Sequence, residues 1–516
     1  MLSVGKAVAS ILLLGAIASG VAAAPALAFE QAPATSAATI ADKLFTDAAA
    51  RAARLAAAPY APPAKDLPKA FEGLDYDGFR KLRPRPDKMV WGETGNPFAV
   101  LPLPRGWVYP HTIAIHFVDA AGNIERHASP SFVDFVDFPW ANDNARAGLG
   151  ASGWRAITKP GQAGVGYEFA VIQGGTYFRA VGEGQVYGVS ARALAIGVGS
   201  PAGEEFPRFT EFWILDPKAF KSDAGESLTF IAISDSPAAA AAYRFVLRPG
   251  SDATIDVVAE IHPRTDIAEP GLAPLSSMFL RGTADPHMKS DARAEVHDSD
   301  GLSILTATGE HIWRPLANPA AVQMSAFVAT PAGFGLEQRR REPAAYGDSE
   351  AKYEHRPSIW IEPHGDWGAG EVRLLEIPTA NEYADNVAAF WRPAEAWRAG
   401  SVQRLTYRLH WTNAPQAMPV ARVVSTEILP VPESRRLQRI NIDFSGQPGF
   451  AEKDLKPDVW STAGALSNTR MTREDEVVRL SFDLDPGASP VVELHAALAD
   501  SSSQQTETWL FRWTPE

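Results

Sequence analysis

The chain has 516 residues, a formal net charge of −13 and no cysteine. The acidic balance argues against nucleic acid and anionic lipid as partners. The missing thiols exclude cysteine nucleophiles, cysteine-based zinc sites, iron–sulfur clusters and disulfides. A chain of this length is expected to form two or more domains whose cores are large enough to be stable without disulfides.

The N-terminus has the pattern of a secretory signal peptide. Lys6 precedes an apolar or small run from 7 to 24, and Ala26-Leu27-Ala28 offers a cleavage site. Glycine and proline interrupt the run and no basic cluster follows it, which disfavours a membrane anchor. No twin arginine precedes it, so the Sec route is expected. We expect residues 1–28 to be removed and the mature chain not to insert into a membrane, because no later stretch reaches about 18 apolar residues.

Residues 29–69 are predicted to form a linker and one N-terminal helix. Residues 31–40 are rich in alanine, serine and threonine, as linkers are. From 40 to 58, apolar side chains recur on one face at helical spacing, and prolines then end the pattern. We expect this helix to pack on the body of the protein.

Residues 70–395 are predicted to form one large antiparallel β-sandwich. Apolar and polar residues alternate over 254–262, and similar runs occur at 112–118 and 373–377. The 40 glycines and 41 prolines suit many turns rather than long helices. Short helical islands are expected between strands, for example at 386–391.

A linker is predicted at 396–403, followed by an immunoglobulin-like sandwich over 404–516. Alternating apolar residues mark its strands: Leu405, Tyr407 and Leu409; Ile440, Ile442 and Phe444; Val478, Leu480, Phe482 and Leu484; and Trp509, Phe511 and Trp513. About seven short strands separated by turns are typical of this architecture.

Common cofactor motifs are missing. The glycine-rich segment 182–188 has the wrong spacing for a dinucleotide loop, and there is no Walker A loop, H-E-x-x-H or G-x-S-x-G motif. The cluster His297-Asp298-Ser299-Asp300 has metal-binding residue types, but further ligands cannot be assigned. The sequence therefore predicts no metal and no cofactor.

Three segments combine carboxylates with aromatic residues or arginines: 295–301, 338–362 and 376–386. Each also has a structural explanation. Asp298-Ser299-Asp300-Gly301 has the composition of a turn, the second segment resembles a solvated charge run, and Asp385 has the chemistry of a helix cap. Hydrolysis of a glycosidic bond needs one carboxylic acid to protonate the leaving oxygen and a second carboxylate to activate water or attack the sugar. Loops of a rigid sandwich can supply that pair.

The chain resembles the osmoregulated periplasmic glucan biosynthesis proteins of the G and D types. The matching segments include Tyr177–Arg192, Gly203–Phe209, Pro274–Phe279, Glu295–Leu302, Trp313–Leu316, Tyr353–Ser358, Trp360–Pro363, Glu376–Thr379 and Asp385–Asn386. The resemblance covers nearly all of the mature chain. It implies a periplasmic protein with a large galactose mutarotase-like β-sandwich joined to an immunoglobulin-like domain.

The resemblance further implies action on a β-1,2-linked glucan backbone, as a β-1,2-glucanase or transglycosylase. Asp385 falls on the general acid of the family, and either Asp298 or Asp300 falls on the base. The predicted substrate-binding residues are Arg339, Tyr353, Arg356, Trp360 and Glu382.

The implied partners are the β-1,2-glucan and the inner-membrane glucan synthase, and homodimerisation stays open. The alternative function is a non-catalytic glucan-binding or assembly factor that works with the synthase. One departure from the family pattern concerns the site: Arg340 stands where members usually carry an acidic residue, which reverses a charge beside the predicted cleft.

Overall fold

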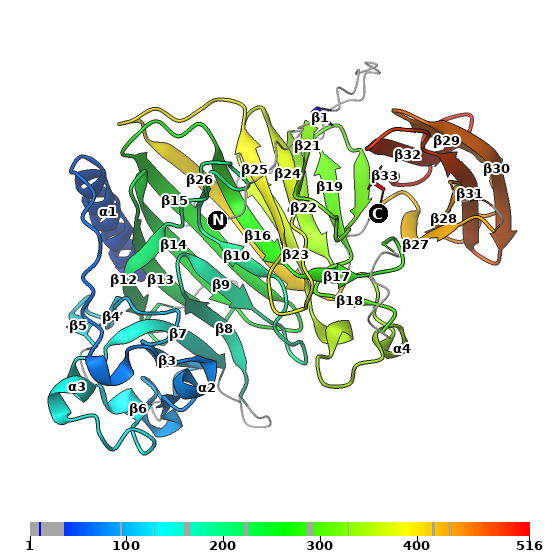
Figure 1. The fold of residues 1–516 in the computed structure, drawn as a ribbon. Coiled ribbons are helices and arrows are strands. Elements are labelled where there is room, and N and C mark those ends of the chain that lie inside the picture. The colour runs from blue at the N-terminus through cyan, green and yellow to red at the C-terminus, as the bar shows by residue number, and fades with distance from the viewer. Residues whose placement is uncertain are drawn as a thin grey trace.

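The computed structural model describes residues 10–11 and 36–515, with gaps at 93–94, 128–129, 159–165, 221–224, 286–292, 329, 415–417, 433 and 435. Apart from residues 10–11, the predicted signal peptide (1–28) lies outside the described residues. Within them strands predominate (Figure 1), which confirms the all-β sandwich prediction. The likeness of the two sandwiches to mutarotase and immunoglobulin domains stays a prediction. None of the helices in the described ranges combines the length and apolar character needed to cross a membrane.

The first sheet of the large domain has the order β1-β21-β24-β25-β16-β10-β9-β8-β7-β3, with β11 paired to β16. Its strands are β1 (Ser10–Ile11), β3 (Phe98–Pro104), β7 (Ala151–Thr158), β8 (Glu168–Gln173), β9 (Tyr177–Ala180), β10 (Ser190–Arg192), β11 (Ala195–Ile196), β16 (Pro270–Ser277), β21 (Gln323–Val328), β24 (Gly370–Glu376) and β25 (Val387–Pro393).

The second sheet has the order β29-β32-β33-β20-β19-β22-β23-β26-β15-β14-β13-β12-β4-β5. Its strands in the large domain are β4 (Ala114–Val118), β5 (Ile124–Arg126), β12 (Arg208–Leu215), β13 (Leu228–Asp235), β14 (Ala239–Arg248), β15 (Ala253–Pro263), β19 (Gly301–Thr306), β20 (His311–Pro315), β22 (Pro331–Glu337), β23 (Ser358–His364) and β26 (Gln403–Thr412). Short ladders join β2 (Arg83–Pro84) to β6 (Val133–Asp134) and β17 (Phe279–Arg281) to β18 (Val296–His297).

The core of the large domain lies between these two sheets. Trp154 of β7 meets Phe230 of β13 edge to face, with ring centroids 4.9 Å apart, and Phe178 of β9 meets Trp411 of β26 at 6.1 Å. The predicted alternation of β15 is confirmed, because every second residue from Ile255 to Ile261 belongs to this core. Large aromatic residues fill the gap between sheets that pack about 10 Å apart.

The predicted N-terminal helix is confirmed as α1 (Ser36–Ala56), which covers the outer face of β13 and β14 (Figure 1). Alternate residues of β14 serve two cores: Ala239 and Ala241 face the sandwich interior, whereas Ala240 and Ala242 pack on the alanines of the helix. Small side chains on both partners let the helix approach the sheet closely. The remaining helices are short: α2 (Tyr76–Phe79), α3 (Asp143–Ala147), α4 (Pro343–Tyr346), and the 3₁₀ turns η1 (Lys69–Phe71), η2 (Pro86–Lys88), η3 (Pro130–Phe132) and η4 (Tyr353–His355).

Two expectations were wrong. The segment 386–391 is not a helical island but contributes β25, which is buried on both faces: Val387, Ala389 and Trp391 face the main core, and Ala388 and Phe390 face a second cluster. The second domain does not begin at residue 404, because β26 pairs with both β15 and β23 inside the large sheet.

The second domain begins after β26 and packs two small sheets against each other (Figure 1). One sheet has the order β27 (Arg422–Pro430), β28 (Gln438–Ser445), β31 (Val477–Asp485) and β30 (Ala465–Glu474). The other contains β29 (Lys456–Ser461), β32 (Val492–Ala499) and β33 (Thr508–Trp513). β33 pairs in parallel with β20, so the small sheet of β29, β32 and β33 is continuous with the second sheet of the large domain.

Candidate active site

Asp385 lies in the loop between β24 and β25, at the wall of a cavity in the large domain. Its side chain is 34% exposed, and Oδ2 lies 3.6 Å from Nη2 of Arg179 on β9. The buried side chain of Asn386 fixes the loop: it accepts the N–H of Phe279 (2.8 Å) and donates to the carbonyls of Phe279 and Ile377 (2.9 and 3.0 Å). These bonds hold an accessible carboxylate beside a positive charge.

Asp298 lies in the loop between β18 and β19 and is buried. Its N–H donates to the carbonyl of Met278 (2.8 Å), and its carboxylate pairs with Arg356. Burial raises the pKa of Asp298 above its ordinary value; the charge of Asp385 adds to this rise, while those of Arg356 and Arg179 oppose it. Asp298 and Asp385 therefore share one electrostatic environment, and Arg179 acts on both.

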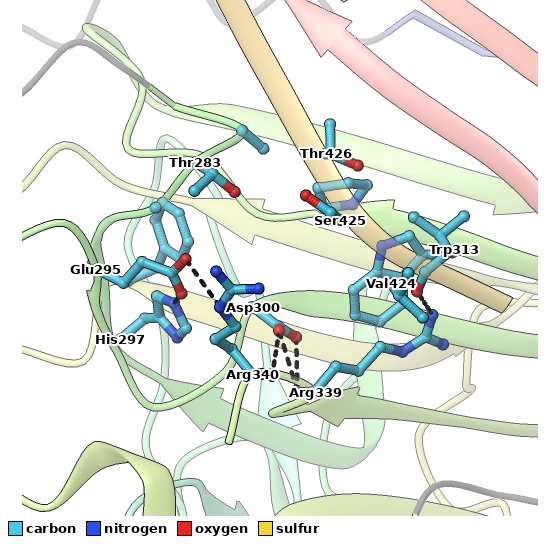
Figure 2. Close-up of a pocket in the computed structure, with 15 residues that line it drawn as sticks. Thr283, Glu295, His297, Asp300, Trp313, Arg339, Arg340, Val424, Ser425 and Thr426 are labelled. Atoms are coloured by element: carbon cyan, nitrogen blue, oxygen red, sulfur yellow. Dashed lines mark hydrogen bonds and ion pairs between the residues drawn. The ribbon is translucent and has the colours of Figure 1, made fainter. Parts of the chain in front are cut away.

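Asp300 has a different orientation, although it is only two residues away. Its carboxylate accepts the backbone N–H groups of Arg339 (3.0 and 3.1 Å to the two oxygens) and Arg340 (3.0 Å), as Figure 2 shows. Its own N–H donates to the carbonyl of Glu337 (2.9 Å). Burial raises its pKa, while the charges of His297 and Arg339 and the two backbone N–H groups oppose the rise. Asp300 thus fixes the chain after β22, whereas Asp298 faces the charges around Asp385.

Tyr353 and Glu382 connect the loops that carry the two aspartates. The Tyr353 hydroxyl donates to Oε2 of Glu382 (3.1 Å), which also lies 2.6 Å from Nη2 of Arg293. The guanidinium of Arg356 stacks on the Tyr353 ring, 4.3 Å from its centroid, while it pairs with Asp298. Four of the predicted site residues are therefore brought together, with Asp385 on the same loop as Glu382.

Neither Trp360 nor Arg339 belongs to this group of four, and none of these six residues lines the cavity that Asp385 lines. The Trp360 indole is 6% exposed and lies against Gly333, where an added Cβ would meet it at 2.2 Å. Its position on β23 gives it a packing role rather than a face for sugar stacking. The prediction that Trp360 binds substrate is therefore not supported by its position.

Arg339 joins the two domains. Its guanidinium lies over the Trp313 ring at 3.5 Å, pairs with Glu337 (2.7 Å), and pairs with Glu507 through two bonds of 2.7 and 2.8 Å. It also donates to the carbonyl of Val423 on β27 (2.9 Å). Burial by itself would lower the pKa of Arg339, but the two carboxylates raise it above the ordinary value. These contacts make Arg339 a structural bridge instead of a ligand for glucan.

A narrow cavity of about 50 Å³ also lies at the domain junction, close to Arg339. Glu295, His297, Asp300 and Arg340 line it from one side and Val424, Ser425 and Thr426 from the other (Figure 2). His297 is buried, with Nδ1 2.8 Å from Gln338 Oε1 and Nε2 3.0 Å from Glu295 Oε2. The cavity is too small for a sugar ring. We interpret the hydrogen-bonded residues around it as a support for the loop that carries Asp298.

The larger cavity beside Asp385 has a volume of about 430 Å³. It is lined by Val108, Tyr109, Val171, Gln173, Gly174, Gly175, Tyr177, Phe178, Arg179, Phe206, Arg208 and Asp385. Four aromatic residues and two arginines thus line the cavity with the carboxylate, a mixture typical of small-molecule sites. Phe206 is 51% exposed.

Sequence reasoning missed the residues of this cavity other than Asp385. Tyr177 and Arg179 lie within the matched segment 177–192, where their alternation with apolar residues marks the open face of a strand. Phe206 and Arg208 belong to another matched segment. Tyr109 had no distinguishing signal. Within the described residues, no group of three or more histidine, aspartate or glutamate side chains is arranged to hold a metal ion.

Comparison with known proteins identifies the family. A family model described as "Periplasmic glucan biosynthesis protein, MdoG" matches residues 44–513. The chain belongs to this periplasmic glucan biosynthesis family. It is 40% identical over 478 residues to glucans biosynthesis protein G of Vibrio cholerae serotype O1, covering 91% of this chain and 86% of the relative. It is also 40% identical over 474 residues to glucans biosynthesis protein G 1 of Shewanella oneidensis, covering 90% and 85%.

Family membership supports a role in periplasmic glucan biosynthesis and, through the family description, a periplasmic location. The printed names of the relatives state glucan biosynthesis and specify no reaction. The chemistry at Asp385 and Asp298 must therefore be argued from their geometry.

Proposed function

We propose that the protein acts on the β-1,2-linked backbone of periplasmic glucan as a glycoside hydrolase or transglycosylase. Asp385 is the general acid and Asp298 the general base. The observation that carries the proposal is the pairing of an accessible carboxylate at a cavity wall with a buried carboxylate in the same electrostatic environment. The two carboxyl groups differ in exposure, and cleavage of a glycosidic bond requires two carboxyl groups in different roles.

The proposed step moves two protons. Asp385 gives its proton to the glycosidic oxygen as the bond from that oxygen to the anomeric carbon breaks. A water molecule, or a hydroxyl of a second sugar, forms the new bond to the anomeric carbon and passes its proton to Asp298, directly or through an intervening hydroxyl or water. Water as acceptor gives hydrolysis, and a sugar hydroxyl gives transfer or ring closure.

The cavity beside Asp385 suits an uncharged saccharide. Tyr109, Tyr177 and Phe206 offer aromatic faces for the apolar C–H faces of sugar rings, while Arg179 and Gln173 offer donors for hydroxyl groups. The net charge of −13 creates no attraction for an anionic polymer. The site thus supports recognition by stacking and hydrogen bonding.

A second candidate function, glucan binding without turnover, is favoured by one observation. Asp298 is 5% exposed and tied to Arg356, so a water molecule reaches it only if the loop moves or a relay carries the proton. In this case the protein would receive glucan from the inner-membrane synthase and guide its assembly.

The deciding experiment is incubation of the mature protein with linear β-1,2-glucan, followed by mass spectrometry of the products. Shortened linear chains would indicate hydrolysis. Products longer than the input, or lighter by one water, would indicate transfer or cyclisation. Unchanged glucan that binds saturably would favour the second candidate and contradict the first.

On the acidic side of the pH profile, kcat/KM is expected to fall at a higher pH than the pKa of an ordinary aspartate would give. The pKa of Asp298 is raised from 3.8 by burial, so its protonated form persists to higher pH. The ionised form of Asp298, which the base role needs, is fully present above this raised pKa and is lost as pH falls through it, so the acid limb follows this titration. Measurement of kcat/KM against pH tests this.

Arg179→Gln should move that limb further upward, because a positive charge that lowers the pKa of Asp298 is removed. Arg398→Gln, which removes an exposed arginine paired with Asp266, should leave the limb in place. An acid limb at the pH of an ordinary carboxyl group, or one unmoved in Arg179→Gln, would contradict the assignment of Asp298.

Phe206→Ala is expected to raise KM for glucan by roughly fivefold, which corresponds to about 1 kcal/mol of lost stacking. Phe206 lines the cavity and is 51% exposed, so its truncation removes ligand contact with little loss of core packing. Trp140→Ala is the matched control, since Trp140 is 65% exposed and does not line this cavity. Equal KM values for the two variants would exclude Phe206 from the binding surface.

A further inference from the structure

A cationic cavity of about 270 Å³ lies between the two domains, separate from the cavity beside Asp385. Its lining residues are Glu337, Gln338, Arg339, Arg340, Arg341, Glu342, Ser358, Asn413, Arg422, Val423 and Val424. Four arginines thus face two glutamates in a protein whose net charge is −13. A local charge opposite to that of the whole chain calls for an explanation.

The positive charges of this cavity are unequally compensated. Arg339 is neutralised by Glu337 and Glu507, as described above. Within the part of the chain that the structure describes, Arg340 has only long ion pairs, 3.5 Å to Glu295 and 3.4 Å to Glu342. The glutamate in the second pair is 68% exposed, so solvent weakens that attraction.

Arg341 is bonded to neutral groups. Its Nη1 donates to the backbone carbonyls of Glu354 (3.0 Å) and Arg356 (2.5 Å), and Nη2 lies 3.4 Å from the Ser358 hydroxyl. Its Nε is buried and has no hydrogen-bond partner among the described residues. The Nε of Arg340 has no hydrogen-bond partner among the described residues either, so two arginines of this cavity keep an N–H that an acceptor could take.

The pKa values of the cavity arginines agree with this picture. Burial lowers the pKa of Arg341 below its ordinary value, and nearby carboxylates only partly offset the effect. Burial also lowers the pKa of Arg422, and the charge of Arg339 adds to the decrease. Both arginines would be stabilised in their charged form by an additional anion.

We infer that this cavity binds an oxyanion of the phosphate class, with Arg341 as its main ligand and Arg340 as a second one. Guanidinium groups present planar pairs of N–H donors that match tetrahedral oxyanions, and such charge-assisted bonds are stronger than neutral ones. The volume exceeds that of a bare phosphate ion, so a phosphate ester with a small organic group is the expected ligand. Val423 and Val424 would contact that organic group.

The position of the cavity gives the anion a structural consequence. Arg340 and Arg341 continue from β22 of the large domain, while Arg422 to Val424 lie on β27 of the second domain. An anion bound between them would tie the two domains together. Its binding should therefore raise the thermal stability of the full chain.

The test is thermal unfolding and calorimetric titration of the mature protein with inorganic phosphate and with phenyl phosphate, at fixed pH and matched ionic strength in chloride. Saturable binding with a rise in Tm is expected, and phenyl phosphate should bind more tightly than inorganic phosphate. Arg341→Gln should weaken binding about tenfold. Arg398→Gln, remote from the cavity, should bind normally.

A second variant keeps the experiment decisive if loss of Arg341 impairs folding. Val424→Glu adds a carboxylate at a residue that is 46% exposed and lines the cavity, and it leaves the bonds of Arg341 intact. It should also weaken phosphate binding about tenfold. The absence of phosphate-specific stabilisation in the native chain, or equal binding by the native chain and Val424→Glu, would overturn the inference.

Discussion

Asp385→Asn is expected to lower kcat/KM on linear β-1,2-glucan by roughly 10²–10⁴-fold without unfolding the protein. The amide is isosteric with the carboxyl group but has no proton of suitable acidity for the leaving oxygen. The cost in stability should be small, because Asp385 is 34% exposed and its ion pair with Arg179 is long, at 3.6 Å. Release of reducing ends, measured beside a thermal melt, separates loss of chemistry from loss of fold.

Asp266→Asn is the matched control for this variant. Asp266 also pairs with an arginine on the surface, Arg398, at 2.8 Å, but it does not line the cavity. The control should keep native activity. Asp298→Asn should lose activity to a similar extent as Asp385→Asn, and the double variant should lose little more, because the two residues act in one step. Native activity in Asp385→Asn would remove it from the acid role.

Glu507→Ala is expected to destabilise the protein by about 3–5 kcal/mol. Glu507 is fully buried, accepts two bonds from Arg339 and accepts the N–H of Val423 at 2.8 Å. The truncation leaves a buried guanidinium with half of its charge compensation and a buried N–H without an acceptor. Because these bonds connect the two domains, equilibrium unfolding in urea should show a separate, earlier transition of the second domain.

Glu493→Ala provides the comparison within one domain. Glu493 pairs with Arg512 at 2.6 Å, and both residues lie on strands of the second domain. Loss of the Glu493 side chain should lower the free energy of unfolding by a smaller amount, because this side chain is 12% exposed. The unfolding curve of this variant should have the same number of transitions as that of the native protein. If Glu507→Ala unfolds in a single transition at native stability, Arg339 does not bridge the domains in solution.

The strands whose alternation was visible in the sequence are those with one face against a core. β15 is such a strand, and its pattern gave its position correctly. β25 lies between two hydrophobic clusters, so the residues on both of its faces are apolar. Its sequence therefore lacks the apolar–polar alternation of a half-buried strand and resembled a short helix. The alternation of Leu405, Tyr407 and Leu409 predicted a strand correctly, but periodicity cannot tell which sheet a strand joins.

Part of the candidate site was predictable from the sequence. The segments 295–301 and 376–386 converge, and side chains from them and from η4 meet around Asp298 and Glu382. Which of two aspartates in one turn faces the charges around Asp385 depends on backbone direction, and only the structure separates Asp298 from Asp300 in this way. The burial of Trp360 was not predictable, because residue type alone does not show which face of a strand is covered.

The measurement that tests the central claim most directly is incubation of the native protein with linear β-1,2-glucan in ¹⁸O-labelled water, followed by mass spectrometry, with Asp385→Asn in parallel. We expect new products with the native chain and at most traces of them with the variant. One ¹⁸O at each new reducing end would identify hydrolysis, and unlabelled longer or cyclic products would identify transfer. Glucan that stays unchanged with the native protein from acid to neutral pH would contradict the account.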